Sequence, residues 1–127
     1  VDEGFRSATA VHPAAVIARG AQIGDGATVM AGAVINTDAR IGAHAIINTG
    51  ATVDHDCSIG DCVHIAPGCH LCGGVSVGAG ALLGAGTTVI PGVRVGANTI
   101  IGAGSTIVQD VPDGARMAGS PCRPITS

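Results

Sequence analysis

Aliphatic residues recur at every sixth position of this chain from residue 11 to residue 107. The series is Val11, Ile17, Ile23, Val29, Ile35, Ile41, Ile47, Val53, Ile59, Ile65, Leu71, Val77, Leu83, Val89, Val95, Ile101 and Ile107. A small or compact residue, for example Ala15, Ala21 or Cys57, stands four positions after each aliphatic. One large and one small inward side chain per hexad would fill a thin core, which predicts a repeat architecture.

The third residue after each aliphatic is Gly, Asp, Asn or His, with only Ala14 and Cys62 departing. These residue types tolerate a positive φ, so the pattern predicts one left-handed corner per hexad. Strands of about three residues that end in such corners cannot pair as hairpins, but they can wind into a solenoid. The sequence therefore predicts an all-β fold whose turns stack on one another.

Composition narrows the function classes. Glycine supplies 21 of 127 residues, Trp and Tyr are absent, and the core must be built from aliphatic residues. The formal net charge is −3, Lys is absent and the six Arg are scattered, so nucleic-acid binding is excluded. No apolar run reaches about 18 residues and no signal peptide is recognisable, so we expect a cytoplasmic protein without a membrane span. Five cysteines, an odd number, indicate reduced thiols.

His55 stands at a position where the repeat does not require an imidazole. It is the second residue after Val53, and Asp54 and Asp56 flank it. Two neighbouring carboxylates would raise the basicity of the ring and fix its tautomer. His55 is therefore the candidate general base. Asp56 and His44 both fall on the positive-φ position, so each also has a structural explanation, and we assign His44 no role.

The remaining His and Cys residues leave a metal site as an alternative. His64 and His70 each precede an inward aliphatic, and spacing alone does not separate a functional role from an outward strand position. Cys69 and Cys72 have the spacing of metal ligands. However, Cys69 occupies the small inward position, as Cys57 does, and both are interpreted as core residues.

The hexapeptide [LIV]-G-x-G-[AST]-x, seen at residues 23–28 and 101–106, resembles the repeat of the hexapeptide acyltransferases. The resemblance implies a left-handed parallel β-helix with three hexads per coil. Residues 11–112 would then make about 5.7 coils, with residues 18 apart stacked in columns. Residues 1–10 would form a junction, and the tail 113–127 would fold back near the cofactor.

One branch is particularly close, because residues 47–61 and 64–68 resemble the sialic acid O-acetyltransferase type proteins and the bacterial nucleotide-amino-sugar N-acetyltransferases. The resemblance implies that His55 is the general base and that Asp56 increases its basicity. It further assigns acetyl-CoA contacts to His64, Gly73, Ala85 and Ala103, and an acceptor contact to Asn48. No metal ligand is expected.

The same resemblance implies an acetyl-CoA-dependent enzyme that acetylates a sugar. We expect transfer to the amino group of a nucleotide-linked amino sugar, with O-acetylation of a sialic acid type sugar as the alternative. His55 and His64 lie half a coil apart and must point in different directions, which agrees with the homotrimers of this family, whose sites lie between subunits. Family members usually carry an N-terminal α/β domain, and residues 5–13 resemble the junction after it, so the chain is either the catalytic part of a longer enzyme or a short form with another acceptor.

Two further functions remain to be weighed. A related carbonic anhydrase family with the same helix holds zinc on three His between subunits, but the spacing of His55, His64 and His70 does not match that pattern. A zinc-dependent β-helix is therefore a remote alternative. Ice-binding β-helices carry ranks of Thr-x-Thr, which this sequence lacks.

Overall fold

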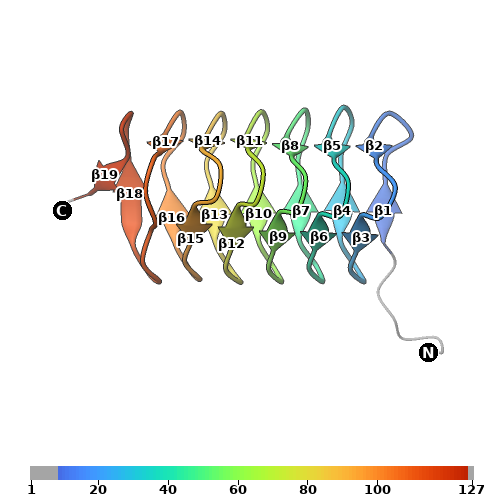
Figure 1. Ribbon diagram of the computed structural model, residues 1–127, viewed down its shortest axis with the longest axis horizontal. Helices are drawn as coiled ribbons and strands as arrows, with labels where there is room; N and C mark the ends of the chain where they lie inside the picture. Colours follow the sequence, from blue (N-terminus) through green and yellow to red (C-terminus); the bar gives the residue numbers. More distant parts are fainter. Residues whose placement is uncertain (1–8, 126–127) are drawn as a thin grey trace.

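The computed structural model describes residues 9–125 as three sheets that wrap into a three-sided β-helix (Figure 1). Sheet A contains β1 (Ala10–Val11), β4 (Thr28–Val29), β7 (Ile46–Ile47), β10 (His64–Ile65), β13 (Leu82–Leu83), β16 (Ile100–Ile101), β18 (Arg116–Ala118) and β19 (Arg123–Pro124). Sheet B contains β2 (Val16–Ile17), β5 (Val34–Ile35), β8 (Thr52–Val53), β11 (His70–Leu71), β14 (Thr88–Val89) and β17 (Thr106–Ile107). Sheet C contains β3 (Gln22–Ile23), β6 (Arg40–Ile41), β9 (Ser58–Ile59), β12 (Ser76–Val77) and β15 (Arg94–Val95).

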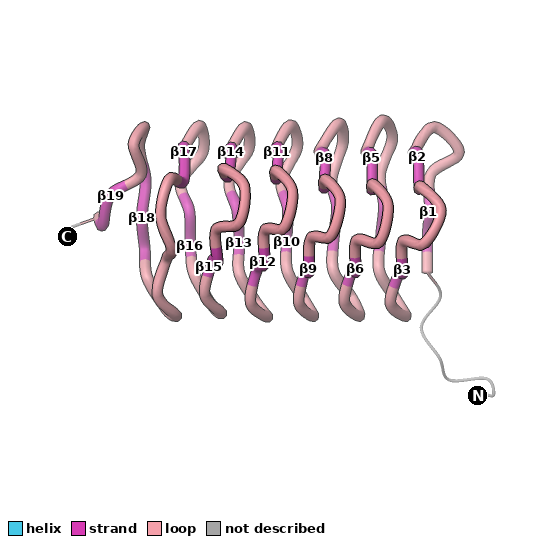
Figure 2. Tube along the Cα trace, in the orientation of Figure 1, coloured by secondary structure: helices cyan, strands magenta, loops and turns pink. Residues whose placement is uncertain are grey.

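Each strand of the repeat pairs in parallel with the strand that follows three positions later. His64 of β10 pairs with Leu82 of β13, and Ser76 of β12 pairs with Arg94 of β15, both 18 residues apart (82 − 64 and 94 − 76). Figure 2 shows the coils lying side by side along the long axis of the molecule, with a corner between successive strands. The all-β class, the stacking of coils and the register of 18 residues are therefore confirmed.

The aliphatic series forms the core from the second coil onward. From Val29 to Ile107 its members are at most 3% exposed. The small inward positions are equally buried, and three of them carry hydroxyls: Thr87, Thr99 and Ser105. Each hydroxyl donates to the carbonyl oxygen of the residue three positions earlier, at 2.6 to 3.1 Å, so the polar groups in the core are satisfied.

The corners follow the prediction with two differences. Positive φ is found at the expected Gly, Asp, His and Asn positions, and also at Cys62, whose φ is 58°. Here the stacking of the neighbouring coils imposes a left-handed corner on a residue that does not favour it. Asp110 was expected to have a positive φ and does not, because the regular repeat ends after β17.

The two ends of the β-helix differ. Val11 is 43% exposed and Ile17 and Ile23 are only half-buried, because no described coil covers the first one. At the other end β18 pairs with β16, and β19 turns back antiparallel to β18. This hairpin buries Met117 and Cys122. Most of the junction expected over residues 1–10 lies outside the described residues.

The outer faces of the sheets differ in polarity. The outward column of sheet A contains Ile46, His64, Leu82 and Ile100 in successive coils. Its three aliphatic members are 36% to 42% exposed. The outward column of sheet C is instead polar, with Gln22, Arg40, Ser58, Ser76 and Arg94. Sheet A is therefore the apolar outer face of the prism.

Candidate active site

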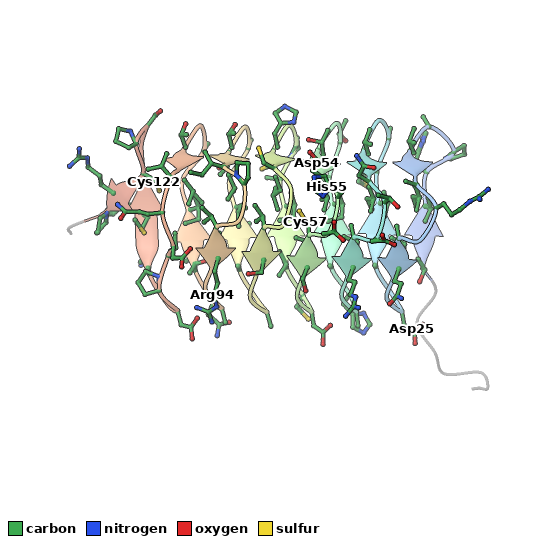
Figure 3. All side chains as sticks on the ribbon, viewed as in Figure 1. Asp25, Asp54, His55, Cys57, Arg94 and Cys122 are labelled. Atoms are coloured by element: carbon green, nitrogen blue, oxygen red, sulfur yellow. The ribbon has the colours of Figure 1, made fainter. Side chains whose placement is uncertain are left out.

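His55 lies on the corner that joins β8 of sheet B to β9 of sheet C, and its side chain is 57% exposed. Its Nδ1 is 3.1 Å from Oδ2 of Asp56. Its backbone N–H donates to Oδ1 of Asp54 at 2.7 Å. Figure 3 shows Asp54 and His55 together on this corner, with Cys57 below them. Two carboxylates therefore hold the segment that carries the imidazole.

The hydrogen bond to Asp56 determines how the imidazole can react. A carboxylate only accepts, so Nδ1 carries the proton and Nε2 keeps a free lone pair. The hydrogen bond from Nδ1 to Asp56 and, next, the negative charge of Asp54 raise the pKa of His55, against a smaller opposing effect of burial. The ring is therefore a stronger base than an ordinary exposed histidine, and Nε2 is the atom that can take a proton.

Gly73 occupies the corresponding corner one coil further along, directly beneath the imidazole. A Cβ at residue 73 would lie 2.5 Å from Nε2 of His55 and 2.6 Å from Cε1. The N–H of Gly74 donates to the carbonyl oxygen of His55 at 3.0 Å. The N–H of Gly73 has no hydrogen-bond partner among residues 9–125. The corner beneath the imidazole of His55 therefore keeps one backbone donor that the coil does not use.

Gly73 is the second residue of its corner, and the backbone N–H at this corner position has a side-chain acceptor in only some of the coils. At Thr37, Thr49 and His55, the side chain of the preceding Asn36, Asn48 or Asp54 accepts its hydrogen bond at 2.7 Å. Ala85 and Ala103 follow glycines, so no side chain can accept from their amides in this way. The residues expected to meet the cofactor thus combine small side chains with uncapped amides, which fits close approach of an extended pantetheine arm.

Asn48 and His64 lie together on a different edge, where sheet A turns into sheet B. Nδ2 of Asn48 is 3.3 Å from Nε2 of His64. Because Oδ1 of Asn48 accepts the N–H of Thr49, its NH₂ group must face the histidine. Ala85 and Ala103 follow on the same edge in the next two coils.

The site residues expected from the sequence therefore divide between two edges of the prism. His55, Asp56 and Gly73 lie on the edge between sheets B and C. Asn48, Ala85 and Ala103 lie on the edge between sheets A and B, and His64 lies beside this edge in β10, so that sheet B separates the two groups. The half-coil spacing predicted that His55 and His64 point in different directions, and the structure places them so.

A hollow of about 490 Å³ lies beside Asp56, on the N-terminal side of the base. Its lining residues are Gly20, Gln22, Asp38, Arg40, Asp56, Cys57 and Ser58. Sequence reasoning did not identify it, because Gln22 and Arg40 occupy ordinary outward strand positions. The signal that could have found it is the column Gly20, Asp38, Asp56, which places a glycine and two carboxylates in successive coils.

The other histidines have local partners or corner positions. Nδ1 of His70 is 2.8 Å from the hydroxyl of Thr52 on the outer face of sheet B. Nδ1 of His12 accepts the N–H of Ala14, and His44 takes a corner φ of 58°. Neither His12 nor His44 belongs to the two groups above.

All five cysteines are free thiols. Cys57 and Cys69 are 1% and 0% exposed, which confirms their interpretation as core residues. Within residues 9–125, no three His, Cys, Asp or Glu side chains are grouped so that they could hold a metal ion. This part of the chain also contains no helix that could cross a membrane.

The family model described as bacterial transferase hexapeptide (six repeats) matches the chain over residues 20–55, 38–73, 56–90 and 74–109. These overlapping matches cover most of the coils, including the edge that carries His55. No match was found among curated protein sequences.

Solved structures give closer relationships. The acetyltransferase domain of PglB from Neisseria gonorrhoeae is 41% identical, with a TM-score of 0.95, and the match covers 96% of this chain and 60% of that one. PerB from Caulobacter crescentus, in complex with CoA and GDP-perosamine, is 50% identical with a TM-score of 0.95, covering 97% and 59%. A histidine-to-alanine variant of GDP-perosamine N-acetyltransferase from the same organism, in the same complex, is 49% identical with a TM-score of 0.96, covering 98% and 59%. The chain thus spans about 60% of the length of these relatives.

Proposed function

The chain belongs to the bacterial transferase hexapeptide family, and from this premise we propose that it transfers the acetyl group of acetyl-CoA to an amino group of a nucleotide-linked amino sugar. The observation that carries the proposal is the arrangement at one corner. A histidine with its Nδ1 held by Asp56 presents a free Nε2 directly over Gly73, whose own amide has no partner among the described residues. The complex of PerB with CoA and GDP-perosamine supports the choice of donor and acceptor class.

His55 acts as the general base in this proposal. Nε2 takes a proton from the acceptor amine as its nitrogen attacks the carbonyl carbon of the thioester. The carbon–sulfur bond then breaks, and the imidazolium returns the proton to the departing sulfur. The products are an amide and free CoA thiol. A base with a pKa near neutrality is suited to this work, and removing one typically costs about 10² to 10⁴ in rate.

Gly73 supplies the donor for the developing oxyanion. Its N–H is not used by the coil, whereas the N–H of Gly74 is already bonded to the carbonyl oxygen of His55, and a Cβ at residue 73 would lie against Nε2. A fixed backbone donor costs no reorganisation when charge develops on the oxygen. The buried thiol of Cys57 has a raised pKa because of burial, so a cysteine nucleophile is not required or favoured.

We place acetyl-CoA along the edge of His64, Ala85 and Ala103. The uncapped amides of the two alanines suit hydrogen bonds to the amide groups of the pantetheine arm, and their small side chains allow the approach. The tail folds back onto sheet A through β18, next to β16 and its following corner. This position supports a role of residues 113–127 beside the nucleotide end of the donor.

We place the acceptor in the hollow beside Asp56. The guanidinium of Arg40 suits a phosphate group, and the carboxylates of Asp38 and Asp56 suit an ammonium group or sugar hydroxyls. Asp56 contacts both the hollow and the imidazole, so a sugar held there approaches the base. Asn48 was expected to hold the acceptor, and in this chain its NH₂ group faces His64. Because Asn48 lies on the His64 edge, it contacts the acceptor whose base is the His55 of a neighbouring chain.

The division of the site between two edges supports a homotrimer. A complete site forms when the His55 edge of one chain meets the His64 edge of the next. The outward column of sheet A, in which three exposed aliphatic side chains accompany His64, supplies an apolar surface for this contact. The cytoplasmic location expected from the sequence stays a prediction.

The deciding experiment measures release of CoA thiol from acetyl-CoA in the presence of UDP-, GDP- and dTDP-linked 4-amino sugars and of sialic acid. We expect turnover with at least one amino sugar and none above background with sialic acid. The same assay on His55→Gln separates enzymatic transfer from spontaneous hydrolysis. Faster turnover of sialic acid than of every amino sugar would establish the O-acetyltransferase alternative instead.

A further inference from the structure

The residue that directly follows each strand of sheet B is an Asn or Asp only in the coil that carries His55 and in the coil before it. In successive coils this column contains Ala18, Asn36, Asp54, Cys72, Ile90 and Val108. Asn36 and Asp54 are its two strong hydrogen-bonding members, and Asp54 immediately precedes His55. The repeat does not require an amide at residue 36, since alanine and isoleucine occupy the same position in other coils.

The side-chain amide of Asn36 is held in one orientation. Its Oδ1 accepts the N–H of Thr37 at 2.7 Å, and of the two polar atoms of a side-chain amide only the oxygen can accept a hydrogen bond. Nδ2 must therefore point the other way, and it donates to Oδ1 of Asp54 at 3.0 Å. The same Oδ1 of Asp54 accepts the N–H of His55 at 2.7 Å. A continuous chain of hydrogen bonds thus runs from Asn36 to the backbone of the base.

The preceding coil also holds the other side of this corner. The N–H of Asp56 donates to the carbonyl oxygen of Thr37 at 3.1 Å, and the hydroxyl of Thr37 donates to the carbonyl oxygen of Arg19 at 2.8 Å. Asn36 and Thr37 together therefore connect to both residues that flank His55. The position of the imidazole depends on the coil before it as well as on its own.

Resting on the proposed function, we propose that Asn36 is a positioning residue for the general base, because it holds the carboxylate of Asp54 against the backbone of His55. The amide is suited to this role in a way that a carboxylate is not. It accepts from Thr37 with one atom and donates to Asp54 with the other, and it adds no charge of its own. An aspartate at residue 36 would instead repel Asp54.

The charges around the imidazole determine the direction of the expected effect. On its own corner these are Asp54 and Asp56. In the preceding coil Asp38 shares the column of Asp56, Arg19 lies two coils away in the column of His55, and the following coil contributes the thiol of Cys72. The charge of Asp54 raises the pKa of His55, and this effect is second in size to that of the hydrogen bond which the ring donates to Asp56. Releasing or neutralising Asp54 therefore lowers the pKa of His55.

A purely structural role for Asp54 makes a different prediction. Asn48 caps the N–H of Thr49 in the same geometry, so an amide serves as a cap as well as a carboxylate does. If Asp54 only caps the corner, Asp54→Asn has no effect on the imidazole. If Asp54 also acts through its charge, Asp54→Asn keeps the cap but removes the charge, and the pKa of His55 falls. This substitution therefore separates the two roles without disturbing the fold.

The experiment uses all 127 residues of the chain, without substitution and as Asn36→Ala and Asp54→Asn. In each protein the imidazole of His55 is titrated by NMR, and the pH profile of kcat/KM is measured. The resonance is assigned by its absence in His55→Gln. We expect the pKa of His55 to fall in Asp54→Asn and to fall by less in Asn36→Ala. The rising limb of the pH profile should move to lower pH in the same order. The plateau of kcat should fall by less than about tenfold, with KM unchanged.

Asp61→Asn is the matched control. Oδ1 of Asp61 accepts the N–H of Ala43 at 2.8 Å at another corner, so this variant removes a charge and keeps a cap without touching the His55 edge. We expect no change in the titration of His55. The double variant Asn36→Ala with Asp54→Asn should match Asp54→Asn alone, because Asn36 acts through Asp54.

An unchanged titration of His55 in Asn36→Ala would overturn the proposal, as would a raised KM with an unchanged pH profile. Asn36→Ser, which keeps a short polar side chain, replaces Asn36→Ala if the alanine variant does not fold. The NMR titration requires no turnover. Absence of acetyl transfer in the unmodified chain would therefore refute the proposed function, while the titration would still decide whether Asn36 acts on His55.

Discussion

The imidazole of His55 and the α-carbon of Gly73 stack directly on each other across one coil. A Cβ at residue 73 would come within 2.5 Å of Nε2 of the histidine, so the ring can occupy its position only because glycine follows 18 residues later. The N–H of the same glycine has no partner among the described residues. One contact thus joins the candidate base to the glycine proposed as the oxyanion donor.

Gly73→Ala should reduce turnover without unfolding the protein. The φ of Gly73 is not in the left-handed region, so alanine introduces no backbone strain there. The new methyl group displaces the flexible imidazole, and a misplacement of this size costs on the order of 10²-fold in kcat. Thermal unfolding should change little. In a His55→Gln background the same substitution should cause no further loss, and an additional large loss there would show that the methyl group acts elsewhere.

His55→Gln should abolish turnover and preserve binding of the donor. The base acts on the acceptor, so kcat should fall by about 10² to 10⁴ while the affinity for CoA stays within about twofold. Calorimetric titration with CoA and thiol release measure the two quantities on the same sample. Loss of CoA binding in this variant would place His55 in the donor site and contradict the proposed mechanism.

Asp56→Asn should shift the pH dependence of the reaction. The hydrogen bond from Nδ1 to Asp56 is the largest cause of the raised pKa of His55, and an asparagine can accept this bond but carries no charge, so the pKa of His55 falls. Since the neutral imidazole is the active form, the rising limb of kcat/KM should move to lower pH. The plateau should fall as well, because a weaker base takes the proton less readily. A limb that stays in place would mean that another group titrates.

Two inactive variants should restore activity when their chains are mixed. If each site combines His55 of one chain with His64 of its neighbour, hybrids of His55→Gln and His64→Gln contain some intact sites. Random mixing leaves about one quarter of the sites complete, so about that share of the activity should return.

Sedimentation at micromolar concentration should show a trimer, and Leu82→Glu on the exposed column of sheet A should dissociate it. A stable, fully active monomer would refute the shared site.

The five thiols should react at very different rates. Burial raises the pKa of Cys57 and Cys69, which are almost completely enclosed, whereas Cys62 is exposed at its corner. Iodoacetamide should therefore label Cys62 first, as mass spectrometry of the intact chain and its peptides can show. Activity should survive this first modification, because the mechanism uses no cysteine. Early loss of activity together with labelling of the half-buried Cys72 would indicate a thiol within the site.

The sequence alone determined the coils and identified His55 as the candidate base. An inward aliphatic every six residues and a corner that tolerates positive φ in each hexad leave a stacked β-solenoid as the consistent fold, because both requirements are local and repeat without a break. His55 could be recognised in the same way, since an imidazole flanked by Asp54 and Asp56 has no place in that pattern. Even Cys62, which broke the corner rule, adopted the corner conformation.

Only the tertiary structure decided which side chains meet between coils. The bonds from Asn36 to Asp54 and from Asn48 to His64 join residues 18 and 16 positions apart, and they depend on side-chain orientations that the repeat does not specify. The hollow at Arg40 likewise depends on side chains from successive coils. Val11 fits the aliphatic series but is exposed, because no described coil covers the first one. A periodic sequence determines the backbone because each coil repeats the same local preferences, whereas its site arises from single polar residues whose partners lie one coil away.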